Sequence, residues 1–292
     1  MLWIYIAIFA YFLDALVFVI DKSLLSKDIP HPSAYAFFVS LLSIFALLLY
    51  PFGVHALAWR DFLVALVCGA SFFVGLVFLY RTVRKIDVTE AMPAIGGVTA
   101  LVTFALSLLI LTQAPTSSHE LLAFLLLVGG TLMMSYFHLS SSTLVDILCS
   151  GSFLALSYVT LKVVFNLTDF INGLFWTRIG LLLAAFSILL LPKVRRQVFG
   201  ALHSASHESK FIFIANKVLA AIAFVLLYYA IKIGDVVFVN AIQGVQYVFI
   251  LVIGLALYHS VPRLFERDEK LFSVRKLIAT VCIIAGVALL FV

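Results

Sequence analysis

The chain has 292 residues, of which 64% are hydrophobic and only 11% charged, with a formal net charge of +5. Its mean hydropathy of +1.20 excludes a soluble globular domain, because no soluble fold of this size could bury so much apolar surface. The positive charge does not indicate nucleic-acid binding, because the basic residues lie between apolar stretches, where membrane topology and lipid headgroups account for them. The expected solvent is a lipid bilayer.

Apolar stretches of about 20 residues tile the chain from end to end. A hydrocarbon core about 30 Å thick needs about 20 helical residues to cross it, and only helices or closed barrels satisfy the backbone there. The sequence therefore predicts an all-α membrane protein with ten transmembrane helices. The first stretch lacks a basic leader and a small-residue cleavage site, so we expect a helix there rather than a signal peptide. The expected spans are 2–20, 33–51, 61–80, 88–111, 120–138, 143–164, 171–191, 210–231, 235–258 and 273–292, with breaks at 28–32, 51–53, 113–116 and 262–270.

The second five stretches resemble a degraded copy of the first five. Lys22 near the end of the first stretch corresponds to Lys162 near the end of the sixth. Because five is odd, the second copy enters the membrane from the opposite side, which predicts two inverted five-helix repeats, 1–139 and 140–292. Inverted repeats of this kind are typical of secondary transporters. Other matched pairs are Pro51 with Pro192, Tyr80 with Tyr228, Asp87 with Asp235, and Gly130 with Gly286.

Short polar motifs at helix ends carry a family resemblance. They are Asp21-Lys22-Ser23, Leu161-Lys162-Val163, Trp176-Thr177-Arg178, and the helix junctions at 79–88 and 227–236. Together with the ten-helix pattern, they resemble the drug/metabolite transporter superfamily, specifically its EamA-like group, over essentially the whole chain. The resemblance implies a carrier whose central cavity is lined mainly by helices 1 to 4 and 6 to 9. Substrates in that superfamily range from amino acids and other metabolites to nucleotide sugars and drugs.

Three charged residues lie deep inside predicted spans, where each costs about 2.5–3.5 kcal/mol on insertion scales. At 1.5 Å per residue, Asp14 lies roughly 15–18 Å into helix 1, and Arg178 and Lys217 lie about 10 Å into helices 7 and 8. Asp14 is the leading candidate for carrying a coupling proton or binding a substrate cation. The alternative is a structural ion pair between Asp14 and either Arg178 or Lys217.

The two deep cations have similar alternatives. Arg178 offers a planar fork suited to a substrate carboxylate or phosphate, or it pairs with a carboxylate or carbonyls of the protein. Lys217 either contacts substrate or extends its ammonium toward the membrane surface.

A polar stripe on predicted helix 9 supplies further candidates for substrate binding. Asn240, Gln243 and Tyr247 follow one another at positions i, i+3 and i+7, which places them on one helical face. Side chains of this kind cross-link helices about as often as they bind ligands. The stripe is therefore either one wall of the pocket or a contact between helices.

Helix 4 is expected to be interrupted near its start. Pro93, Gly96 and Gly97 occupy positions that align with the region of Gly244 in the second half, and interrupted helices at matched positions often mark a transport site. These residues are hinge candidates, with tight helix packing as the alternative. Glu90 is a second candidate for coupling, although an acidic residue at a helix N-terminus also interacts favourably with the helix dipole.

No catalytic pattern is present, neither His-Glu-x-x-His nor Gly-x-Ser-x-Gly nor a phosphate-binding glycine loop. We therefore expect no enzyme activity, cofactor or metal. The expected function is secondary transport of a small polar metabolite, such as an amino-acid-like solute, by alternating access in an inner or plasma membrane. The expected partners are that substrate and the bilayer, and the pattern is compatible with a homodimer. The rival readings are a non-transporting membrane subunit or scaffold, an intramembrane enzyme, and a carrier of nucleotide sugars or cationic drugs.

Two considerations about orientation conflict. Most lysines and arginines lie in the odd-numbered connections, so the positive-inside rule places both termini outside. The family resemblance implies cytosolic termini.

Overall fold

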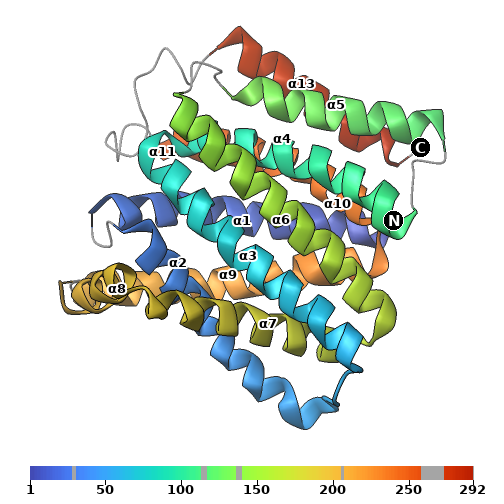
Figure 1. Ribbon diagram of the computed structural model, residues 1–292. Coiled ribbons are helices and arrows are strands. Elements are labelled where there is room, and N and C mark those ends of the chain that lie inside the picture. The colour runs from blue at the N-terminus through green and yellow to red at the C-terminus, as the bar shows by residue number, and fades with distance from the viewer. Residues whose placement is uncertain (28–30, 113–116, 136–139, 205–206, 258–272, 292) are drawn as a thin grey trace.

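The computed structural model describes residues 1–27, 31–112, 117–135, 140–204, 207–257 and 273–291. Every regular element in these ranges is a helix, which confirms the all-α fold (Figure 1). The predicted breaks at 28–30, 113–116 and 262–270 lie outside the described residues. In the first part of the chain the elements are α1 (Leu2–Lys27), α2 (Pro32–Leu41), the 3-10 helix η1 (Leu42–Phe52), α3 (Trp59–Lys85), α4 (Val88–Leu106), the short π-helical η2 (Ser107–Leu111) and α5 (Ser118–Met134). They continue with α6 (Ser141–Leu167), α7 (Phe170–Ser187), η3 (Ile188–Leu190), α8 (Pro192–Ser204), α9 (His207–Ile233), α10 (Val236–Ile242), α11 (Gly244–Leu257) and α13 (Val274–Leu289).

Within the described residues, eight helical spans are long and apolar enough to cross a bilayer. Large apolar side chains such as Leu109, Leu190 and Phe211 lie exposed on the outside of the bundle, where a soluble protein would carry polar groups. The chain is therefore a multi-pass membrane protein. The eight spans are Leu2–Leu24, Pro32–Phe52, Trp59–Lys85, Val88–Leu111, Ser141–Leu167, Phe170–Leu190, Lys210–Ile233 and Val236–Ala256.

Two shorter helices, α5 and α13, pack side by side along one edge of the bundle, and the two chain ends lie at the same end of it (Figure 1). Helix α5 has 17 residues and begins with a capping box, in which Ser117 and Glu120 satisfy each other's backbone amides. Helix α13 has 16 residues and carries Arg275 and Lys276 in its first turn.

Two boundaries differ from the predicted ones. Helix α1 continues through Lys27 instead of ending at residue 20, so Asp21 lies inside the helix rather than at its end. The stretch between 191 and 210, expected to be a connection, contains the basic helix α8, whose Val198 and Ala201 are buried. Its basic and apolar residues alternate so that one face of the helix is buried. The segment as a whole is too polar to be predicted as a membrane span.

The second span changes geometry along its length. It begins as the α-helix α2 and continues as η1, a 3-10 helix of 11 residues. Runs of 3-10 helix longer than three or four residues are uncommon and often mark a hinge or a strained sequence. The span ends at Gly53, whose φ of +93° lies in the left-handed region that glycine adopts without steric cost.

Helices α3 and α6 form the most extensive helix contact in the bundle and pack along much of their length. Two hydroxyl groups of α6 hydrogen-bond to backbone carbonyls of α3: Ser150 Oγ donates to Gly75 at 3.0 Å and Ser157 Oγ donates to Cys68 at 2.9 Å. Small and hydroxyl-bearing residues are the usual contacts between helices in lipid, because they allow close approach and add hydrogen bonds. Helices α7 and α6 both cover α3, and α1 packs against α9.

Glycines set the close contact between α5 and α13. A Cβ added to Gly130 of α5 would lie 2.9 Å from the carbonyl oxygen of Ala279, and one added to Gly286 of α13 would lie 3.1 Å from that of Ala123. Each glycine thus sits against the backbone of the facing helix. The packing leaves no room for a side chain at either position.

We expect Gly130→Ala to lower the free energy of unfolding by about 1–3 kcal/mol, because the new methyl group overpacks the helix contact. Gly129 is a matched control, because it is the preceding residue of α5 and nothing lies within 4 Å of its Cβ position. Gly129→Ala should raise stability by up to about 1 kcal/mol through helix propensity alone. Thermal unfolding of the purified protein in detergent measures both, and equal shifts of the same sign would contradict the packing.

Candidate functional site

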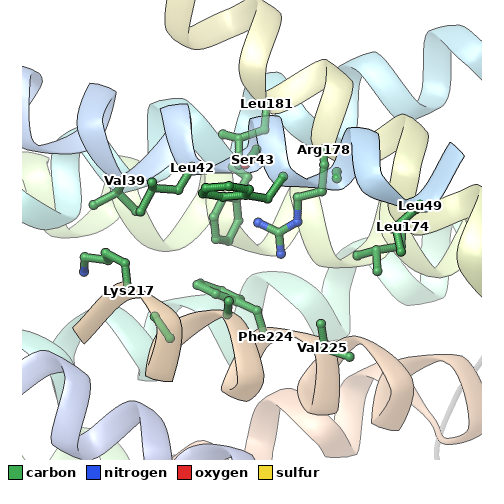
Figure 2. Close-up of a pocket in the computed structure, with 15 residues that line it drawn as sticks. Val39, Leu42, Ser43, Leu49, Leu174, Arg178, Leu181, Lys217, Phe224 and Val225 are labelled. Atoms are coloured by element: carbon green, nitrogen blue, oxygen red, sulfur yellow. The ribbon is translucent and has the colours of Figure 1, made fainter. Parts of the chain in front are cut away.

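A cavity of about 250 Å³ lies between the second span and helices α3, α7 and α9 (Figure 2). The second span and α3 come from the first half of the chain, and α7 and α9 from the second. Its lining combines two basic side chains, one serine and twelve apolar residues. The lining residues are Val39, Leu42, Ser43, Phe45, Ala46, Leu49, Phe72, Leu174, Arg178, Leu181, Lys217, Ala220, Ala221, Phe224 and Val225.

Arg178 extends from α7 across the cavity toward Phe224 of α9 (Figure 2). Its guanidinium carbon lies 4.7 Å from the ring centroid of Tyr228, 5.0 Å from that of Phe224 and 5.9 Å from that of Phe72. Among the described residues it has no hydrogen bond and no ion pair. The side chain is therefore held by cation–π contacts, which stabilise a guanidinium by about 0.5–2 kcal/mol and leave its five N–H donors unused.

Lys217, at the other end of the cavity in Figure 2, is paired with an acidic residue. Its Nζ lies 2.5 Å from Oδ1 and 2.7 Å from Oδ2 of Asp21 in α1. Both side chains are buried, Asp21 being 1% and Lys217 5% exposed. The predicted alternative in which Lys217 pairs with Asp14 is wrong: the partner is the residue seven positions later, because α1 extends far enough to bury it.

The Asp21 carboxylate also collects three neutral donors. Tyr35 Oη donates to Oδ1 at 2.7 Å, Tyr80 Oη donates to Oδ2 at 3.1 Å, and Asn216 Nδ2 donates to Oδ1 at 2.6 Å. These donors come from α2, α3 and α9, so one carboxylate ties four helices together. A buried charge needs such a complete set of partners to be tolerated in a low-dielectric interior. We refer to Asp21, Tyr35, Tyr80, Asn216 and Lys217 as the Asp21 cluster.

Asp14 does not line the cavity, although it is only 6% exposed. Among the described residues its carboxylate has no hydrogen bond and no ion pair, but it lies within electrostatic range of Lys217 and Asp21. The neighbouring Tyr11 donates its hydroxyl to the carbonyl of Val239 at 2.9 Å, which links α1 to α10. Asp14 is thus an acidic side chain enclosed near the interface of the two halves of the chain.

The polar stripe of predicted helix 9 lies at a one-residue break within that span, where Gln243 keeps helical dihedral angles but its amide bonds to the carbonyl of Asn240, three residues earlier. Helix α10 ends at Ile242 and α11 begins at Gly244, with Gln243 between them. Buried polar atoms gather at the break without partners among the described residues: Asn240 Oδ1, Gln243 Oε1 and the hydroxyl of Tyr247. None of these residues lines the cavity beside Arg178.

Helix α4 is continuous, contrary to the interruption expected near its start. Pro93 lies within Val88–Leu106, where it removes one amide donor but does not end the helix. A Cβ on Gly96 would clash with the Tyr247 side chain, and one on Gly97 with Leu132. Gly244 is similarly close to Thr131. These glycines serve close helix packing in this conformation.

Glu90 lies in the first turn of α4, three residues after the N-cap residue Asp87. The Asp87 side chain accepts a hydrogen bond from the amide of Thr89. The position of Glu90 matches the expected alternative of an acidic group interacting with a helix N-terminus. Among the described residues, no group of three or more His, Cys, Asp or Glu side chains could hold a metal ion.

Several residues of the Asp21 cluster were missed as site residues from the sequence. Asp21 and Tyr80 belong to the motifs that carry the family resemblance, but Tyr35 and Asn216 do not. One feature of the sequence points to Asp21: it follows Asp14 by seven positions, two helical turns, so a longer helix 1 would place both acids on one face.

Comparisons with known proteins support the fold. No family model and no curated protein matches this sequence. A solved structure described only as "Crystal structure of protein" aligns with 99% of this chain and 95% of its own chain, with a TM-score of 0.63 and 14% sequence identity. At that identity the likeness shows a shared fold and carries no information about substrate.

We expect Asp21→Asn to lower the free energy of unfolding by about 3–5 kcal/mol, because it leaves the Lys217 ammonium buried without its counter-charge. The double variant Asp21→Asn with Lys217→Met should recover part of this loss, since it removes the unpaired charge as well. Asp61→Asn, at the start of α3, is the control and should shift stability by less than about 1 kcal/mol. Thermal unfolding in detergent measures all three, and a double variant no more stable than Asp21→Asn would contradict the pairing.

Proposed function

We propose that this chain is a secondary carrier of the EamA-like, drug/metabolite transporter type, which moves a small metabolite across the membrane by alternating access. The observation that carries this proposal is the cavity between the two halves of the chain, into which Arg178 projects with no acidic partner among the described residues. An unpaired guanidinium beside an open cavity within a membrane span is costly and marks a functional site more often than a structural one, which favours a carrier over a scaffold.

Contacts at the helix junctions support the inverted repeat. Lys22 Nζ donates to the carbonyls of Val83 and Ile86, at 2.6 and 2.8 Å, where α3 gives way to α4. Lys162 lies 140 residues after Lys22. Two of its acceptors, Ile231 and Gly234, lie 148 residues after Val83 and Ile86, at the junction where α9 gives way to α10. Matched lysines thus cap matched junctions in the two halves. The acceptors of Lys162 are the carbonyls of Ile231, Lys232 and Gly234, at 2.9, 3.2 and 2.7 Å.

The contact between α5 and α13 has the same reciprocal form. A Cβ on Gly130 of α5 would contact Ala279 and Ile283 of α13, and a Cβ on Gly286 of α13 would contact Ala123 and Leu127 of α5. Each of the three α13 residues lies 156 positions after its counterpart in α5. An exchange of this kind is expected of two elements related by a two-fold axis. It supports α5 and α13 as the fifth and tenth spans of a ten-helix protein with repeats 1–139 and 140–292.

The inverted repeat gives the carrier its mechanism. The cavity is bounded by elements of both halves, so a rocking of one half against the other would change which side of the membrane it faces. The long 3-10 segment η1, which forms one wall, is the element best suited to change its helical geometry during that movement. The multi-pass architecture fits an inner or plasma membrane.

Asp14 is the coupling residue of this proposal. It is buried, lacks a hydrogen-bonded or ion-paired partner among the described residues, and lies within electrostatic range of the Asp21–Lys217 pair. A proton taken up by Asp14 would alter the charge balance around that pair and so bias the packing of α1 against α9. Cationic drugs are disfavoured as substrates, because both charged residues in the cavity are basic.

Arg178→Gln should reduce uptake into proteoliposomes at least about tenfold, because loss of a charged hydrogen-bond donor costs about 1.5–3 kcal/mol. Arg60→Gln, at the exposed start of α3, is the matched control and should retain uptake. Screening wild-type proteoliposomes with a panel of radiolabelled metabolites identifies the substrate for this measurement. Equal uptake by wild type and Arg178→Gln would contradict the proposed role of the cavity in substrate binding.

Asp14→Asn should abolish accumulation of substrate against its gradient while leaving exchange of internal for external substrate intact, because exchange needs no net proton movement. Uptake driven by an imposed pH gradient and exchange in its absence are the two measurements. Asp61→Asn is the control. Full accumulation by Asp14→Asn would remove this residue from coupling.

A further inference from the structure

The cavity carries an unbalanced positive charge. Its fifteen lining residues include two cations and no aspartate or glutamate. Lys217 is already neutralised, since both oxygens of Asp21 lie within 2.7 Å of its ammonium. The free charge therefore resides on Arg178.

The surroundings of Arg178 indicate which chemical group of a ligand would satisfy its unused N–H donors. Three aromatic ring centroids lie 4.7–5.9 Å from the guanidinium carbon, and the ring faces offer no hydrogen-bond acceptor to its N–H groups. A guanidinium binds a carboxylate through two parallel hydrogen bonds, which is the strongest pairing available to it. Beside the apolar lining of this cavity such a pairing gains more than it would in bulk solvent.

The remainder of the cavity is suited to an apolar body. Leu42 and Leu49 of η1, Leu174 of α7 and Phe224 and Val225 of α9 surround the space beside Arg178 (Figure 2). Ser43 is the one neutral hydrogen-bonding side chain in the lining. A volume of about 250 Å³ lies just below the usual range for ligand pockets, roughly 300–1,000 Å³, and so favours a small molecule.

The lining also disfavours an amino acid. The ammonium group of a zwitterion would enter a space whose lining offers no carboxylate to receive it, while the guanidinium of Arg178 would repel it. Desolvating such a group without a counter-charge is costly. Asp14, which could have balanced an ammonium, is outside the lining.

We infer that the cavity binds a small amphipathic monocarboxylate, whose carboxylate pairs with Arg178 and whose aryl or short alkyl body packs against the leucines, Phe224 and Val225. This inference rests on the proposed function, since it names the substrate class of the same site. The exposed residues Phe45 and Val225 border the cavity between η1 and α9. The carboxylate therefore reaches the site either from water or as a fatty acid from the surrounding lipid.

Calorimetric titration of the purified full-length protein in detergent tests the ligand class without requiring transport. The probes are 3-phenylpropanoate, its neutral amide 3-phenylpropanamide, phenylalanine, succinate and palmitate. We expect 3-phenylpropanoate to bind at least about tenfold more tightly than the amide, phenylalanine or succinate, because only the first satisfies both the charge and the apolar wall. Tighter binding of palmitate, whose chain is too long for the cavity and would have to extend past the exposed Phe45 and Val225 into the lipid, would identify the membrane as the source. Equal binding of acid and amide, or tighter binding of phenylalanine, would overturn the inference.

Two variants locate the binding. Arg178→Gln should remove the difference between 3-phenylpropanoate and its amide, whereas Arg60→Gln should preserve it. Val225→Trp, which fills the apolar part and leaves Arg178 in place, should weaken 3-phenylpropanoate at least about tenfold but spare propanoate. This second variant keeps the test decisive if Arg178→Gln does not fold. A Val225→Trp protein that binds both acids as wild type does would place the ligand elsewhere.

Separate outcomes distinguish this inference from the proposed function. Binding of 3-phenylpropanoate without uptake into proteoliposomes would leave the ligand class standing and remove the carrier. Uptake of an uncharged or zwitterionic metabolite, with no binding of 3-phenylpropanoate, would keep the carrier and remove the ligand class.

Discussion

A charge placed within hydrocarbon must find a partner, and this constraint decides the arrangement of the polar side chains in the bundle. The Asp21 carboxylate meets it with the Lys217 ammonium and three neutral donors from α2, α3 and α9. Four helices are thereby joined at one buried point. Because both oxygens of the Asp21 carboxylate accept hydrogen bonds within the cluster, the charge of Lys217 is neutralised by the protein itself.

Arg178 meets the same constraint in a different way. Its neighbours are aromatic faces, which attract a cation but provide no oxygen for its N–H groups. Its N–H donors therefore remain unused among the described residues, beside a cavity of about 250 Å³. Two cations thus line one cavity in different states: Lys217 is paired with a carboxylate, whereas Arg178 has only cation–π contacts among the described residues.

Both features lie where the two halves of the chain meet. The Asp21 cluster joins α1, α2 and α3 to α9, and the cavity lies between the second span and helices α7 and α9. Any movement of one half against the other must change the cavity and strain the cluster together. Asp14 lies within electrostatic range of the Asp21–Lys217 pair, on the same helix as Asp21.

The sequence alone determined the all-helical membrane fold, because long apolar stretches in lipid can satisfy their backbone only as helices. It also predicted that Arg178 and Lys217 lie within membrane spans, and the structure has both inside spanning helices, with Lys217 buried and Arg178 half-buried. The partner of Lys217 was decided by tertiary structure: Asp21 lies 196 residues away, in a part of α1 that the apolar pattern did not include. The same holds for Asn240, Gln243 and Tyr247, which lie at a helix break outside the cavity, and for the continuity of α4 through Pro93. Which side chains meet depends on how helices from the two halves cross, and the periodicity of a single helix does not contain that information.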